Sequence, residues 1–134
     1  MKIVLDTDVI VAALRSPSGA SAELLRRARQ EQITLAASVS LFMEYEAVCT
    51  RPEHLAASDL SARQFGLFLD GLASIVQPVE VHFLWRPQWR DLTDELVLEA
   101  TINASACALL AFNQKHFVGF AKRFQVEVIL FMRH

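Results

Sequence analysis

The chain has few of the residues that mark several common protein classes. Its 134 residues include only four glycines and two cysteines. With so few glycines it has no glycine-rich phosphate loop, which disfavours a small α/β nucleotide-binding module. Cys49 and Cys107 are isolated and lack the spacing of zinc sites or of a disulfide framework. We expect both to be small core residues of a cytoplasmic protein.

Long apolar runs are also missing, although 53% of the residues are hydrophobic. No stretch approaches the roughly 20 apolar residues that a membrane helix needs. Asp6 and Asp8 interrupt the first apolar region, which excludes a signal peptide. We expect one domain spanning residues 1–134 and no association with a membrane.

Positive charge is not in excess, because the net charge is −2. This excludes nucleic-acid binding through bulk positive charge but leaves room for a local patch. Arg26, Arg27 and Arg29 cluster on one predicted helix. Such a cluster is more often a solvated face than a phosphate contact, and the sequence leaves both readings open.

Short apolar runs alternate with segments of helical spacing. Strands are predicted at residues 2–5, 33–36, 108–111 and 126–131, with extended segments at 75–76 and 79–81 broken by Pro78. Helices are predicted at 22–30, from Ser38 until Pro52 stops it, after the capping-box sequence at 61–64, and from 93 onward. This alternation predicts an α/β fold, a three-layer α/β/α sandwich with a central parallel sheet of about five strands.

Acidic residues recur at the ends or on the faces of the predicted elements. Asp6 follows the first strand, and Asp8 is placed to cap the next helix. Glu44 lies within an apolar helix, and Asp94 and Glu95 begin another. Each acid alone has an ordinary explanation, since acids cap helices and glutamate favours them. Together they are typical of a hard-cation site built from oxygen ligands.

Several segments in order along the chain resemble a PIN domain, most closely the toxin components of toxin–antitoxin systems. The resemblance lies in IVLDTDV at 3–9, SPSG at 16–19, residues 38–41 with Glu44, VHFLWRP at 81–87 and RDLTDELVLEA at 90–100. It implies a Mg²⁺- or Mn²⁺-dependent endoribonuclease with a five-stranded parallel sheet. It also implies a cognate antitoxin as partner, and dimers are common in such families.

The resemblance assigns roles to particular residues. Asp6, Glu44 and Asp94 match the catalytic acids, which also hold the metal, with Glu95 as a further ligand. Thr7 matches a position whose hydroxyl lies near the metal.

Three positions depart from the family pattern. Asp8 stands where the family usually has asparagine, Asn113 where it has aspartate, and Cys107 where aspartate precedes the fourth strand. We expect Asp8 and Asn113 to support the site. The loss of a carboxylate at Asn113 also favours an alternative, a catalytically impaired PIN fold that binds antitoxin or RNA.

The substrate implied by the resemblance is single-stranded RNA, cut at a phosphodiester bond by water activated on the metal. We expect Arg15, Arg51 and Arg90 to hold flanking phosphates. Trp85 and Trp89 are placed to stack bases, although packing is the commoner role for such residues. An apolar surface for a dimer or antitoxin is expected on the helices that carry Phe65, Phe68, Leu72, Leu96 and Val97.

Overall fold

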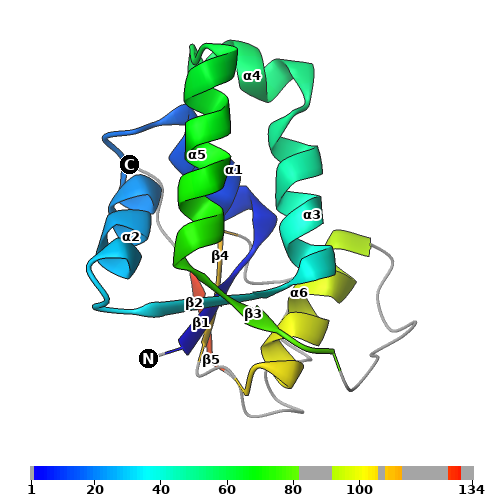
Figure 1. Cartoon of the computed structure of the whole chain (residues 1–134). Coiled ribbons are helices and arrows are strands. Elements are labelled where there is room, and N and C mark those ends of the chain that lie inside the picture. The colour runs from blue at the N-terminus through cyan, green and yellow to red at the C-terminus, as the bar shows by residue number, and fades with distance from the viewer. Residues whose placement is uncertain (1, 82–91, 106–107, 113–126, 131–134) are drawn as a thin grey trace.

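The protein is built around a parallel β-sheet, seen in a computed structural model (Figure 1). The structure describes residues 2–81, 92–105, 108–112 and 127–130, and for residues 92, 93, 95 and 127–130 only the backbone. Five strands form the sheet in the order β3-β2-β1-β4-β5, and all neighbouring pairs are parallel. They are β1 (Lys2–Leu5), β2 (Thr34–Ser38), β3 (Val76–Val79), β4 (Ala108–Ala111) and β5 (Glu127–Leu130). The predicted parallel sheet is confirmed.

Helices flank this sheet. The structure describes α1 (Thr7–Arg15), α2 (Ala20–Arg29), α3 (Val39–Cys49), α4 (Pro52–Ser58), α5 (Ala62–Ile75) and α6 (Leu92–Asn103). Figure 1 shows α1 to α5 gathered on one side of the sheet and α6 on the other. Connections between parallel strands are right-handed, so the change of direction after β3 sends α6 to the opposite face. The predicted α/β/α fold is confirmed.

Three helices begin at side chains that cap them. The hydroxyl of Ser38 accepts a hydrogen bond from the backbone N–H of Leu41, at 3.0 Å, and so begins α3 as predicted. Ser61 and Gln64 form the predicted capping box of α5. The cap of α1 is Asp6, and the prediction that Asp8 caps this helix is wrong. Asp6 is the cap because its backbone is extended, outside the helix, and its carboxylate accepts a hydrogen bond from the backbone N–H of Thr7, the first residue of α1.

Two segments around prolines differ from the prediction. Pro52 ends one helix but also occupies the first turn of α4, which the sequence analysis did not anticipate. Proline is tolerated there because the first-turn amides have no helical partner. Pro78 does not break β3, which runs through it. Proline has no backbone N–H to donate. Because β3 is an edge strand, no further strand lies on its open side to need that donor, so proline is tolerated there.

The core lies between the central strands and their helices. Val4 in β1 and Leu109 in β4 are completely buried, as expected for the middle of a sheet that is covered on both faces. No helix in the described ranges is both long and apolar enough to cross a bilayer.

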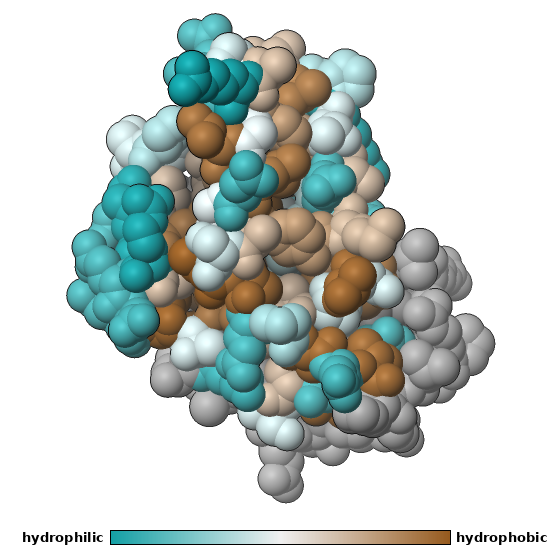
Figure 2. Space-filling view, in the orientation of Figure 1, coloured by the Kyte–Doolittle hydropathy of each residue, from teal (hydrophilic) through white to brown (hydrophobic). Residues whose placement is uncertain are grey.

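The apolar surface predicted on α5 and α6 is mostly buried within the monomer. Leu72, Leu96 and Val97 belong to the core, and Phe65 and Phe68 are half-buried against it. That part of the prediction is wrong, because α6 uses its apolar side chains to cover β1 and β2, while α5 packs its own against the core and contacts α2. The large apolar side chains that are exposed among the described residues are Val39, Met43 and Leu67. Figure 2, in the orientation of Figure 1, shows apolar side chains near the centre of the visible face and hydrophilic side chains over α2.

Candidate active site

Asp6 lies where the chain leaves the central strand of the sheet. Its backbone N–H donates to the carbonyl oxygen of Leu110 in β4, at 2.9 Å, and its carboxylate accepts from the N–H of Thr7, at 2.8 Å. The side chain is only 5% exposed. The strand order reverses direction between β1 and β4, and ligands of open α/β sheets bind in the crevice at such a point. The sequence prediction that Asp6 ends the first strand is confirmed.

Tyr45 joins α3 to the same strand end. Its hydroxyl donates a hydrogen bond of 2.6 Å to the carbonyl oxygen of Leu5, and the residue is fully buried. Burial raises the pKa of the Tyr45 phenol far above its ordinary range, and the negative charge of Asp6 raises it further. The phenol therefore stays protonated and remains a donor at all physiological pH values. Sequence reasoning placed Tyr45 in the helix but did not find this bond.

Glu44 lies on the inward face of α3. It shares that face with Leu41, Tyr45 and Val48, which are buried, because residues three and four apart stack along a helix. Glu44 itself is half-buried, at the border of this face. Since Tyr45 fixes α3 against the end of β1, Glu44 lies at the border of the helix face that is held there.

Asp94 lies on α6, on the other side of the sheet, and like Glu44 it is half-buried on a helix. It is half-buried in the first turn of α6, on the face that contains the buried residues Val97, Leu98 and Thr101. Helix α6 packs against β1, β2 and α3. The three predicted catalytic acids therefore belong to three elements that contact one another.

The donor chemistry near Asp6 fits a hard cation, because Mg²⁺ and Mn²⁺ prefer oxygen ligands. The Thr7 hydroxyl oxygen is buried and has no hydrogen-bond partner among the described residues. Within those residues, however, no three His, Cys, Asp or Glu side chains are placed to hold a metal ion. The metal-binding roles of Asp6, Glu44 and Asp94 stay predictions. Asn113, Arg90 and the side chain of Glu95 lie outside the described residues.

Asp8 is exposed in the first turn of α1 and lines a cavity of about 340 Å³. Two predicted phosphate contacts, Arg15 and Arg51, line the same cavity, although they are far apart in sequence. His54 and Phe112 line it as well. Sequence reasoning missed both, since neither His54 in the unpredicted α4 nor a single phenylalanine after β4 carries a recognisable signal.

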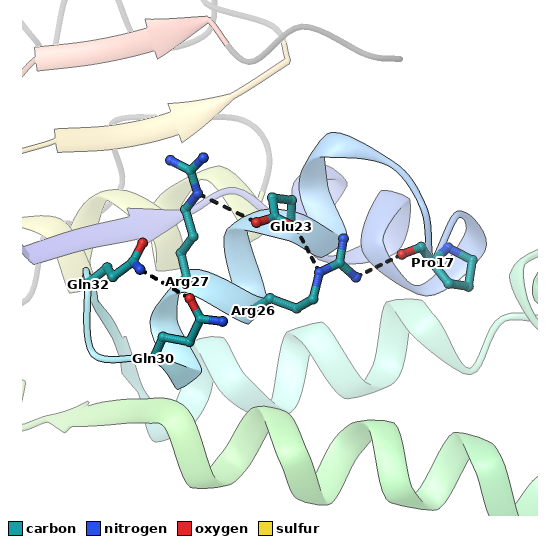
Figure 3. Close-up of polar contacts among 6 residues, drawn as sticks. All are labelled: Pro17, Glu23, Arg26, Arg27, Gln30 and Gln32. Carbon is teal, nitrogen blue, oxygen red and sulfur yellow. Dashed lines mark hydrogen bonds and ion pairs between the residues drawn. The ribbon is translucent and has the colours of Figure 1, made fainter.

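Two of the three clustered arginines on α2, Arg26 and Arg27, contact Glu23 of the same helix (Figure 3). The Glu23 carboxylate accepts from Arg26 at 2.8 Å and lies 3.7 Å from Arg27, and Arg26 also donates to the carbonyl oxygen of Pro17. The hydrogen bond from Arg26 lowers the pKa of Glu23. All three charged side chains are exposed, so this helix presents a solvated polar face.

Comparison with known families agrees with the geometry. The sequence model of one family, described as the PIN domain, matches residues 2–115. That range contains β1, β4 and every residue named above as a candidate site. No curated protein and no solved structure matches the chain.

Proposed function

Because this chain belongs to the PIN-domain family, a family of nucleases, we propose that it is a metal-dependent endoribonuclease that hydrolyses phosphodiester bonds of single-stranded RNA. The observation that supports the proposal most is the buried carboxylate of Asp6 at the reversal point of a parallel sheet. A carboxylate in that position is costly unless a cation or hydrogen bonds compensate it.

Different residues of the chain would hold the metal, position its ligands and bind the RNA. Asp6, Glu44 and Asp94, with Glu95, would hold Mg²⁺ or Mn²⁺, and the Thr7 hydroxyl would orient one of the groups around it. The metal, when bound, activates water for attack and neutralises charge on the scissile phosphate. Tyr45 would keep the end of β1, and with it Asp6, at a fixed distance from α3. Arg15, Arg51 and Arg90 would hold the flanking phosphates, with Asp8 and Asn113 in support.

The toxin role and the partners are part of the same proposal. A nuclease that cuts RNA in its own cell needs to be restrained, and a cognate antitoxin protein would do so.

Val39 and Met43 are 69% and 64% exposed and lie one turn apart on α3, which suits burial against a second copy of the chain. We therefore propose that the protein forms a homodimer through this face of α3.

The test compares wild type, Asp6→Asn and Asn113→Asp on one single-stranded RNA with Mg²⁺ or Mn²⁺. Wild type is expected to cut, and Asp6→Asn is expected to lose cleavage while keeping its fold. Asp70→Asn is the matched control, because Asp70 is an exposed acid on α5. It is expected to cut as wild type does.

Two results would overturn the proposal. If wild type and Asp6→Asn cut equally well, the metal site is not at Asp6. If wild type is silent and only Asn113→Asp cuts, the protein is the catalytically impaired form that binds antitoxin or RNA.

A further inference from the structure

The cavity beside α1 is lined by one continuous face of that helix. Asp8, Val11, Ala12 and Arg15 are three, one and three residues apart, which places them in a stripe along the helix. The other walls come from the first residues of α2, from the region around α4 and from Phe112 at the end of β4. At about 340 Å³ the cavity is at the lower end of the size range of small-molecule sites.

The two arginines in this wall differ from those on α2. Neither the Arg15 side chain nor the Arg51 side chain forms a hydrogen bond or an ion pair with another described residue, whereas Arg26 and Arg27 both contact Glu23. Two guanidinium groups facing one cavity form a fork for phosphate oxygens. Ala20 and Ser21, the first residues of α2, line the same space, and the N-terminus of a helix adds positive potential.

Charge is arranged along this stripe in one direction. Asp8 is in the first turn of α1, two residues after Asp6, and Arg15 is in the last turn. Their backbones are about 10 Å apart along the helix axis, from the rise per residue. The acidic end faces the proposed metal site, and the basic end faces away from it. An RNA strand whose scissile phosphate lies near Asp6 would therefore meet positive charge toward the end of α1.

His54 adds a polar ring to the wall of the same cavity. A neutral imidazole nitrogen can accept a hydrogen bond from a hydroxyl, which a ribose has and a deoxyribose lacks at the 2′ position.

We propose that this cavity is a subsite for one ribonucleotide of the RNA strand. Arg15 and Arg51 bind a phosphate next to the scissile one, and His54 accepts a hydrogen bond from the ribose hydroxyl. The inference rests on the proposed nuclease function and adds how the strand is held and how RNA is told from DNA. It requires no particular base, so the subsite is indifferent to sequence.

Binding is measured with the full chain and a chelator, so that no cleavage occurs. The probe is a fluorescein-labelled oligouridine of about 12 nucleotides, long enough for a typical single-strand site. Arg15→Gln and Arg51→Gln are each expected to raise Kd by about tenfold. Each is also expected to reduce the slope of log K against log salt by about 0.7, the value for one lost phosphate contact. Arg63→Gln is the control, because Arg63 is exposed on α5 outside the cavity.

A second comparison tests the ribose contact. His54→Phe keeps a ring of similar size, and it is expected to weaken binding of the oligouridine while leaving binding of the matching oligodeoxyuridine unchanged. The subsite is wrong if the arginine variants bind as Arg63→Gln does, if wild type binds no RNA, or if His54→Phe weakens RNA and DNA binding equally. Binding that depends on both arginines in a protein that never cuts would leave the subsite standing and overturn the nuclease instead.

Discussion

The hydroxyl of Tyr45 in α3 donates a 2.6 Å hydrogen bond to the carbonyl oxygen of Leu5, the residue before Asp6. The two residues are 40 positions apart in sequence. This bond fixes the helix that carries Glu44 to the strand end that carries Asp6. Both partners are buried, so water cannot replace either of them.

Removing the hydroxyl is expected to destabilise the fold. Tyr45→Phe keeps the ring in the core but leaves the Leu5 carbonyl without this donor, at a cost of about 1–2 kcal/mol. Thermal unfolding should show Tm lower than wild type by roughly 4–8 °C. Ser74→Ala is the control, since the Ser74 hydroxyl also donates to a carbonyl but is exposed. Equal Tm changes in the two variants would show that the buried bond has no special role.

Neutralising Asp6 is expected to leave the metal-free protein at least as stable as wild type. Asparagine caps a helix about as well as aspartate, so Asp6→Asn keeps the start of α1. The substitution also removes a charge that is costly to bury. Chemical unfolding with a chelator present measures this directly. A large loss of stability would mean that the charge of Asp6 is needed to hold the fold itself.

Restoring a carboxylate at position 113 is expected to strengthen metal binding. Asn113→Asp adds the negative charge that the family pattern has after the fourth strand, and a hard cation gains affinity from it. Calorimetric titration with Mn²⁺ should give a lower Kd for Asn113→Asp than for wild type. Gln77→Glu, at an exposed position of β3, serves as the control for added charge alone. Equal affinities in all three proteins would place the metal away from residue 113.

Alkaline pH is expected to destabilise the protein through Cys49. Burial raises the pKa of this thiol from 9.0 to about 11. The folded protein therefore holds the proton more tightly than the unfolded chain, and the stabilisation is complete below pH 9. It is lost progressively as the pH rises from 9 toward 11. The free energy of unfolding, measured with denaturant across this pH window, should fall more steeply for wild type than for Cys49→Ala. Parallel curves for the two proteins would contradict the assignment to Cys49.

Dimer formation is expected to depend on the exposed face of α3. Replacing Met43 by lysine and Val39 by serine removes two exposed apolar side chains without touching the core. Light scattering should show a lower average mass for the double variant than for wild type at the same concentration. Leu67→Lys, on the exposed side of α5, is the matched control. A wild type that stays monomeric at high concentration would overturn the dimer.

The sequence by itself determined the elements whose causes are local. The apolar runs of β1 and β4, the Ser38 cap of α3 and the capping box at Ser61 were predictable, because each depends on neighbouring residues. The parallel sheet followed from their alternation. The position of Asp6 at a strand end followed in the same way, whereas its role as the central acid of the site stays a prediction.

Only the tertiary structure decided what lies beside these elements. The bond between Tyr45 and Leu5 and the cavity shared by Arg15, Arg51 and His54 join residues that no local pattern connects. The burial of Leu72 and Val97, expected to form an exposed patch, depended on how α5 and α6 pack against the rest of the chain. Hydrophobic periodicity shows which face of a helix is apolar, but the packing of the whole chain decides whether that face meets the core or the solvent.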